Sequence, residues 1–207
     1  EVPDFTQSPE QFGLELRVGV FNPLNLGTAF SSTAYFGSDV GPHLSAQVHY
    51  YPFRLPVMGM VGIGLGLGWS QWDTNTPGGL EAERNVFEIL ELQLMLLWRM
   101  DTLARELNVP LVLTPKLGLE FDHWLTSPGT ATNPEPNGWA IGPRFAGKIS
   151  LELDFLEPRA ARQLDEEWGI NHSELFFEAY YSMAGDLAAD QLPISGWGWA
   201  IGLGFTF

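Results

Sequence analysis

The C-terminal stretch Ser195–Phe207 constrains the fold of this chain more than any other segment. Its large apolar residues share one parity and its small residues share the other: Trp197, Trp199, Ile201, Leu203, Phe205 and Phe207 against Gly196, Gly198, Ala200, Gly202, Gly204 and Thr206. Because side chains alternate with period two along a strand, this pattern predicts a strand with one bulky face and one nearly bare face. A water-facing surface would carry charge on the second face, whereas glycine suits a crowded concave interior.

Similar alternation along the rest of the chain predicts eight strands. We place them at Phe12–Phe21, Pro42–Phe53, Met58–Ser70, Val86–Arg99, Leu111–Trp124, Gly138–Phe155, Asn171–Met183 and Ser195–Phe207. Each is close to or longer than the ~9–11 residues that cross a bilayer at a tilt. Pro115 cannot donate a ladder hydrogen bond, so we expect a bulge there.

The connections between these strands fall into two alternating classes. On one side lie four long polar segments: Asn22–Val40, Gln71–Asn85, Leu125–Asn137 and Ala184–Ile194. On the other side lie a tight turn at Arg54–Pro56 and two segments with helical pattern, 101–107 and 157–168, the second followed by Gly169 as a stop signal. Residues 1–11 read as a polar N-terminal tail and residues 12–207 as a single domain.

The closing stretch resembles the C-terminal strand of bacterial outer-membrane β-barrels. Phe207, Phe205 and Gly202 match that class's assembly signal, while Ala200 stands where the signal has a polar residue. Over the whole chain the architecture is similar to eight-stranded barrels of the OmpA, OmpX and OmpW type. The resemblance implies an all-β fold: an eight-stranded antiparallel transmembrane β-barrel with short periplasmic helices, located in the bacterial outer membrane. It also implies contact with outer-membrane lipids and lipopolysaccharide, and with the barrel-assembly machinery through the C-terminal strand.

Composition agrees with this reading. Charged residues make up 17% of the chain, below the roughly 25% usual for soluble domains. The net charge of -15 argues against nucleic acid as a partner, and the absence of cysteine excludes thiolate metal sites. No apolar run approaches the ~20 residues of a transmembrane helix. The chain begins at Glu1 without a basic segment, so we expect an exported protein whose signal peptide has been removed.

Aromatic residues gather near both predicted rims, as expected of membrane interfaces. The outer rim carries Trp69, Trp72, Trp124, Trp139 and Trp197, and the inner rim carries Tyr50, Phe53, Trp98, Phe155, Phe205 and Phe207. The alternative is a soluble barrel of lipocalin type with the pattern inverted. A soluble barrel would expose glycine-lined patches to water, and it would not explain why aromatic residues gather at both rims.

The inward parity predicts a charge network in the lumen. Its members are Glu15, Arg17, Glu91, Lys116, Glu120, Arg144, Lys148, Glu152 and Glu178. Charges so far from bulk water must be paired. We expect Arg17 to pair with Glu15 and Lys116 with Glu91, and Arg144 or Lys148 to pair with Glu120 and Glu178. The network is interpreted as a polar plug, and the alternative is a proton or ion pathway.

A catalytic site finds little support in the sequence. His123, Ser127 and Asp122 lie near the outer end of one predicted strand, but His123 and Asp122 point to opposite faces. His43 and His172 lie near opposite rims, and Asp186 and Asp190 are too sparse for a calcium site. We therefore predict no catalytic residue, no metal and no cofactor.

The predicted helix at 157–168 is a candidate docking element for periplasmic partners. It carries Arg159, Arg162 and Trp168, and the simpler alternative is a lid on the barrel mouth. The sequence predicts a non-enzymatic membrane anchor or scaffold, or a component of an envelope complex. The alternatives are a narrow channel for small solutes or ions and, third, a lipid-modifying enzyme.

Overall fold

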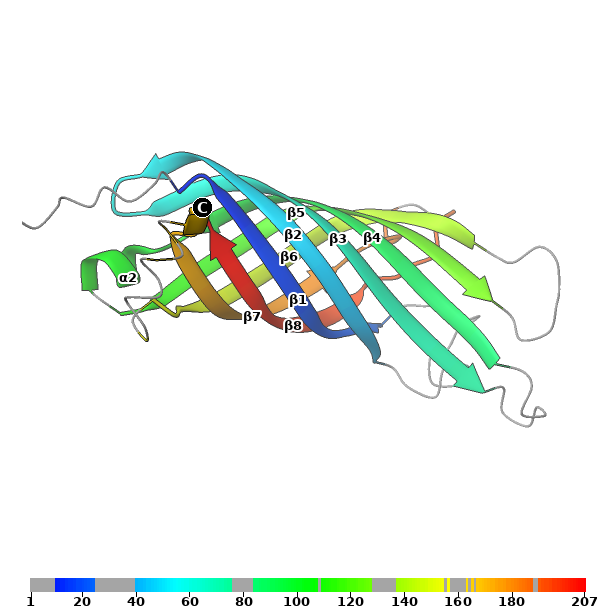
Figure 1. Cartoon of the computed structure of the whole chain (residues 1–207). Coiled ribbons are helices and arrows are strands. Elements are labelled where there is room, and N and C mark those ends of the chain that lie inside the picture. The colour runs from blue at the N-terminus through cyan, green and yellow to red at the C-terminus, as the bar shows by residue number, and fades with distance from the viewer. Residues whose placement is uncertain are drawn as a thin grey trace, which may run out of the picture.

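The computed structural model describes residues 10–24, 40–75, 84–107, 109–127, 137–154, 156, 163, 165, 167–187 and 190–207. Its strands are β1 (Phe12–Pro23), β2 (Gly41–Leu55), β3 (Gly59–Asn75), β4 (Arg84–Arg99), β5 (Leu111–Ser127), β6 (Asn137–Glu152), β7 (His172–Ser182) and β8 (Gly196–Thr206). The helix α2 (Thr102–Leu107) lies between β4 and β5 (Figure 1).

The eight strands form one closed antiparallel barrel in chain order, with β8 pairing back to β1. The predicted all-β, eight-stranded antiparallel barrel is therefore confirmed. Figure 1 shows α2, the β2–β3 turn and the C-terminus together at one end of the barrel. We call this end periplasmic and the opposite end outer, following the orientation predicted from the loops.

The strands differ in length, and β3 to β6 extend into segments that the sequence predicted to be outer loops. β3 to β6 contain 16 or 17 residues each, whereas β7 and β8 contain 11. The segment Gln71–Asn75, expected in a loop, extends β3 and pairs with β4. The hydrogen bonds of a hairpin ladder join backbone groups, which every residue except proline supplies. The polar composition of Gln71–Asn75 therefore did not show where the β3–β4 ladder ends.

The bulge expected at Pro115 is absent. β5 pairs with β6 directly through Pro115 and Gly147 without a shift in register. The irregularity lies instead in β2, between Tyr50 and Phe53, where its register with β3 shifts. Toward β4, the β5 ladder stops at Leu97–Lys116 and resumes in the same register at Met100–Leu113. Proline has no N–H, so it interrupts one ladder and leaves the other intact.

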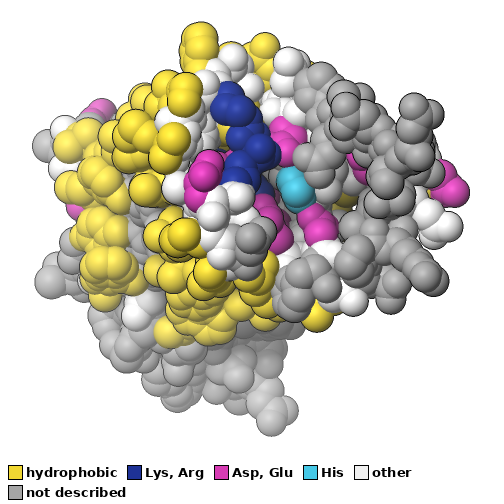
Figure 2. Space-filling view, turned by 90° about the vertical axis from the view of Figure 1, so that its left-hand side faces the viewer, with side chains coloured by type: hydrophobic (Ala, Val, Ile, Leu, Met, Phe, Trp, Pro, Cys, Tyr) yellow, Lys and Arg dark blue, Asp and Glu magenta, His cyan; other side chains and the backbone are white. Residues whose placement is uncertain are grey.

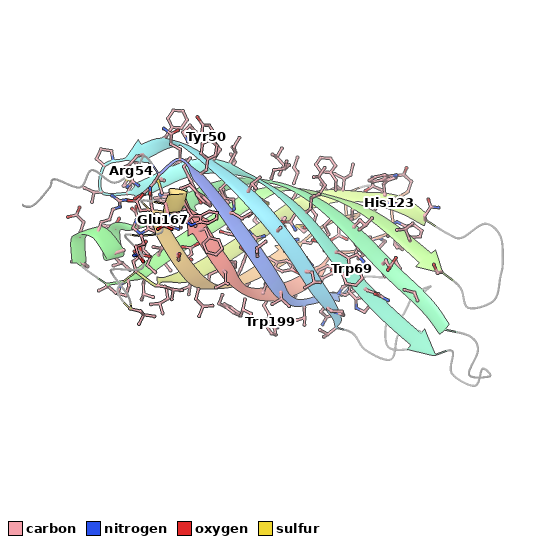
Figure 3. The ribbon with its side chains drawn as sticks, viewed as in Figure 1. Tyr50, Arg54, Trp69, His123, Glu167 and Trp199 are labelled. Atoms are coloured by element: carbon pink, nitrogen blue, oxygen red, sulfur yellow. The ribbon has the colours of Figure 1, made fainter. Side chains whose placement is uncertain are left out.

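The wall is apolar outside and charged inside (Figure 3). On the outer surface Leu67 is 65% exposed and Leu92 41%, whereas Glu15 and Lys148 inside are each 2% exposed. A surface of this kind suits hydrocarbon, and the paired charges suit a lumen closed to bulk water. Among the described residues, no helix has the length and hydropathy needed to cross a membrane.

Glycines on the inner face of β8 leave room for bulky lumen side chains from β7. A methyl group at Gly198 would overlap the Tyr180 ring, and one at Gly202 would meet Phe176 and the Leu16 carbonyl. The bare face recognised in the sequence is therefore filled by side chains of its neighbours.

The predicted helix at 157–168 lies largely outside the described residues. Four described members are helical: Gln163, Asp165, Glu167 and Trp168. Gly169 follows with a φ of 67°, and its N–H donates to the Asp165 carbonyl at 3.0 Å. A glycine in this left-handed conformation ends a helix without steric cost, as the sequence indicated.

Candidate functional site

The lumen is the candidate site because it gathers buried charged side chains from five strands: β1, β4, β5, β6 and β7. Of the nine residues predicted to line it, eight are buried, and the Glu152 side chain is 14% exposed. Their backbone positions alternate with the outward apolar residues, so the strand period places them inside.

Glu15 on β1 is the hub of the periplasmic half of the lumen. It accepts hydrogen bonds from Lys116 at 2.8 Å, from Lys148 at 2.7 Å and from Arg17. Lys116 also lies 2.7 Å from Glu178. The predicted pairing of Lys116 with Glu91 on the neighbouring strand β4 was wrong. Lys116 instead reaches across the lumen to acids on β1 and β7.

Arg99, which was not among the residues predicted to line the lumen, completes this half. It donates to Glu174 at 2.7 Å and to Glu152 at 3.0 Å, and Lys148 also donates to Glu174. Arg99 shares the inward parity of Glu91 and Gln93 on β4, which is the signal that would have identified it. The four cations of this half, Arg17, Arg99, Lys116 and Lys148, thus face four acids, Glu15, Glu152, Glu174 and Glu178.

The outer half of the lumen is acidic around a single guanidinium. Arg144 on β6 donates to Glu120 and, at 3.3 Å, to Glu91, and its guanidinium carbon lies 3.7 Å from the centre of the Tyr180 ring. Asp122 is also buried here, and one of its carboxylate oxygens has no hydrogen-bond partner among the described residues. No group of three or more acidic or histidine side chains in the described chain is arranged to hold a metal ion.

An apolar cluster, which we call the outer plug, fills the lumen above Arg144. Its members are Phe21, Trp72, Phe87, Ile89, Ala140, Tyr180, Ala184 and Ile194, and Trp124 packs against it. The Trp72 and Phe87 rings are 5.7 Å apart, and the Phe87 and Trp124 rings 6.4 Å. The sequence placed Trp72 and Trp124 at the lipid interface, and this was wrong: both lie on the inward parity of their strands.

The β7–β8 connection contributes to the outer plug. Ala184 and Ile194 are fully buried and joined by a 2.8 Å backbone hydrogen bond, and the Gly185 N–H donates to the Ile141 carbonyl at 3.1 Å. The sequence predicted a polar loop without structure here. The two ends of the connection instead pack into the outer plug, beside the short strands β7 and β8.

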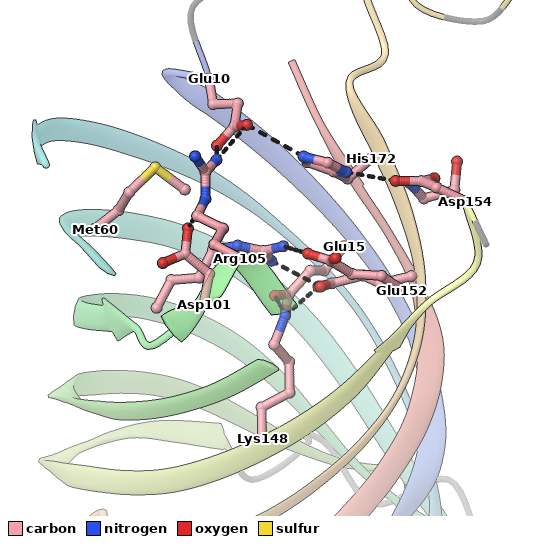
Figure 4. A network of polar contacts seen from close by, with 12 residues as sticks. Glu10, Glu15, Met60, Asp101, Arg105, Lys148, Glu152, Asp154 and His172 are labelled. Atoms are coloured by element: carbon pink, nitrogen blue, oxygen red, sulfur yellow. Dashed lines mark hydrogen bonds and ion pairs between the residues drawn. The ribbon is translucent and has the colours of Figure 1, made fainter. Parts of the chain in front are cut away.

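Six charged residues, which we call the periplasmic clamp, lie across the opposite end: Glu10, Arg54, Asp101, Arg105, Asp154 and His172. Arg105 donates to both carboxylate oxygens of Glu10, at 2.6 and 2.8 Å, and His172 lies 3.1 Å from it (Figure 4). Arg54 contacts both Glu10 and Asp101. Figure 2 shows these charged types gathered at the centre of this end, beside the hydrophobic outer wall.

The clamp fixes the end of the N-terminal tail. Burial alone would raise the pKa of Glu10, but the hydrogen bond and charge of His172, with the charges of Arg105 and Arg54, lower that pKa to about 2. The adjoining Gln11 N–H donates to the Phe207 carbonyl at 2.7 Å, and the backbone N–H of Tyr51 donates to the Gln11 carbonyl at 2.8 Å. The tail of residues 1–11 is thus attached to the barrel at its last two residues.

His123 and Asp122, which the sequence offered as the weak alternative of a catalytic site, do not come together in the structure. The His123 ring packs on Trp139 with 4.4 Å between ring centres, and Asp122 is buried in the lumen. A different trio, His43, Ser70 and Glu91, has hydrolase residue types, with His43 3.0 Å from the Ser70 hydroxyl and 3.2 Å from Glu91. Each is at most 4% exposed, so the Ser70 hydroxyl lies inside the lumen, away from the protein surface.

The remaining predicted interface and docking residues lie on the outer surface or outside the described chain. Trp139 is 63% and Trp197 58% exposed on the wall, while Trp69, Trp98, Phe205 and Phe207 are partly buried. Trp168 is 73% exposed beyond the periplasmic end. Arg159 and Arg162 fall outside the described residues.

No protein-family model matches the sequence, and no curated protein matches it. Solved structures that share its fold include two with a TM-score above 0.5. OprG, an outer membrane protein from Pseudomonas aeruginosa, gives a TM-score of 0.54 at 12% identity, covering 99% of each chain. Ail, the attachment invasion locus protein of Yersinia pestis, in complex with the heparin analogue sucrose octasulfate, gives 0.52 at 8% identity, covering 96% of this chain and 100% of Ail. The chain therefore has the fold of the eight-stranded β-barrels of the bacterial outer membrane.

Proposed function

We propose that this protein is a non-enzymatic barrel of the bacterial outer membrane, exported there, that acts as an anchor or scaffold in the cell envelope. The observation that carries this proposal is the filled lumen. The outer plug, the buried charge network and the periplasmic clamp follow one another along the barrel axis. A barrel filled in this way presents surfaces to partners and no path to solutes.

Single-channel recording in a planar bilayer tests the sealed lumen. The purified protein is expected to give no steady conductance, with an open porin in the same bilayer as the positive control. Steady conductance would refute the plugged lumen and support the narrow-channel alternative, for which the acid surplus around Arg144 is the favouring feature.

Lipid modification is tested separately. Radiolabelled lipid A is expected to remain unchanged in the presence of the protein. Turnover that is lost on His123→Ala, or on Ser70→Ala, would contradict the non-enzymatic assignment.

The periplasmic surface is the proposed site for protein partners. Its support is the exposed Trp168 indole, in a stretch of the sequence that also contains Arg159 and Arg162. Deleting residues 159–168 is expected to remove specific proteins from those that co-purify from native membranes, and Trp168→Ala to weaken their retention. An unchanged set would refute docking and leave the segment as a lid.

Lipids and the assembly machinery are the other proposed partners. The outward Leu, Ile and Trp side chains suit lipid and the lipid portion of lipopolysaccharide. Phe205 lies near the end of β8, and Phe207 follows the strand directly. Removal of Phe207 is expected to slow insertion by the assembly machinery in reconstituted vesicles. Ail was solved in complex with the heparin analogue sucrose octasulfate, a polyanion, whereas the net charge of -15 makes a polyanion an unfavourable ligand for this chain.

A further inference from the structure

A groove of about 440 Å³ opens on the outer wall near the periplasmic end, between β3, β4 and β5. Its walls include Leu55 at the end of β2, Met58 of the β2–β3 turn, Leu96 and Trp98 of β4, and Pro115 and Leu117 of β5. The Trp98 indole N–H donates to the Met58 carbonyl at 2.8 Å and so holds the turn against the strand. The volume lies within the roughly 300–1,000 Å³ typical of small-molecule sites.

The groove lies over the break in the β4–β5 ladder. Met100 and Leu113 exchange both backbone hydrogen bonds, at 2.7 and 3.3 Å. Hydrogen-bonded and non-hydrogen-bonded pairs alternate along an antiparallel ladder, so Trp98 and Pro115, two residues further on, occupy the next hydrogen-bonded position. Pro115 has no N–H, so the Trp98 carbonyl lacks its ladder donor. An unsatisfied carbonyl is costly near hydrocarbon, and a ligand with an N–H donor would relieve that cost.

The surroundings indicate what kind of ligand fits. The groove is continuous with the outward wall, where Leu96 is 60% and Leu117 49% exposed, and its lining is almost entirely apolar. It lies at the periplasmic end, at the depth of the inner leaflet. Trp98 and Pro115 lie toward the rim, and Leu96 and Leu117 lie one step toward the membrane centre. A polar group at the rim with an apolar chain running inward matches a lipid.

We propose that this groove binds one phosphatidylethanolamine molecule of the inner leaflet. An acyl chain lies along Leu96 and Leu117, and the head-group ammonium donates to the Trp98 carbonyl. The proposal rests on the proposed membrane location and adds a specific lipid site to it.

The test uses the full chain inserted in vesicles of equal parts phosphatidylethanolamine and phosphatidylcholine, whose choline group has no N–H. After extraction in mild detergent, native mass spectrometry identifies the lipid that remains bound. Wild type is expected to retain phosphatidylethanolamine about tenfold over phosphatidylcholine, as one charge-assisted hydrogen bond would give. Leu117→Trp, which fills the groove, is expected to lose both lipids, and Pro115→Val, which supplies the missing N–H, to lose the preference.

Leu203→Trp on β8 is the matched control, because it adds the same bulk to the outward wall far from the groove. It is expected to behave as wild type. Equal retention by Leu117→Trp and the control, or no head-group preference in wild type, would overturn the proposal. Proteolytic protection of each variant in the vesicles reports insertion: a wild type that fails to insert refutes the membrane location, whereas inserted protein without bound lipid refutes only the groove.

Discussion

Replacing Glu15 by glutamine removes the acid on which the periplasmic half of the lumen is centred. Lys116 and Lys148 donate to it at 2.8 and 2.7 Å, and Arg17 donates to it as well. After the replacement each cation keeps one other acid, Glu178 or Glu174. Four cations then face three acids, so one positive charge in the buried network has no counter-charge.

The expected cost follows from that imbalance. Removing one partner of a buried ion pair costs about 3–5 kcal/mol, because the other charge stays buried without compensation. Replacing Lys148 by glutamine in the same chain restores the balance. The double variant Glu15→Gln/Lys148→Gln is therefore expected to be more stable than the sum of the two single effects by about 0.5–3 kcal/mol.

Urea unfolding in detergent micelles, followed by tryptophan fluorescence, measures these free energies of unfolding. Glu106→Gln on the exposed face of α2 is the control and is expected to leave stability unchanged. A loss below about 1 kcal/mol for Glu15→Gln, or single effects that simply add, would refute the reasoning that the network is dry and mutually dependent.

Three further outcomes follow from other parts of the barrel. The pKa of Glu10, about 2 against an ordinary value of 4.5, means that the clamp stabilises the fold above about pH 4.5 and that this contribution is lost as pH falls toward 2. The protection factor of the Gln11 amide, which corrects its exchange rate for the intrinsic pH dependence, should therefore fall over that range, and Glu10→Gln should abolish the change. Phe87→Ala in the outer plug should cost about 3–5 kcal/mol in urea unfolding, whereas Leu67→Ala on the lipid-facing wall should cost clearly less; equal losses would contradict a packed plug. Gly202→Ala should reduce the folded fraction on a heat-modifiability gel, because its methyl group meets the Leu16 carbonyl, while Gly147→Ala has open space and should fold as wild type.

The barrel and the content of its lumen were accessible from sequence because both depend on a local rule. Strand side chains alternate, so the parity of Leu203 and Gly202 on β8 already separates wall from interior. The same rule placed Glu15, Lys116 and Arg144 inside. The rule also places Arg99 inside, but Arg99 is the last residue of β4 and was not included among the predicted lumen residues.

What the sequence did not provide depends on distances across the lumen. Lys116 pairs with Glu15 and Glu178 because β5 faces β1 and β7 through the interior, and no sequence spacing encodes that separation. Trp72 and Trp124 were assigned to a girdle by their depth, although their parity pointed inward. The burial of Ile194 and the capture of Glu10 by Arg105 join segments through tertiary contacts alone.

The central claim is that the Leu, Phe and Trp parity meets hydrocarbon and the charged parity does not. The chain has no cysteine, so single cysteines can carry spin labels without background. Labels at Leu67→Cys and Leu92→Cys in vesicles should be relaxed by oxygen, which dissolves in lipid, and not by a water-soluble nickel complex, with Glu106→Cys as the aqueous control. Relaxation of the Leu67 and Leu92 labels by the nickel complex would show that this face meets water, and would contradict the account.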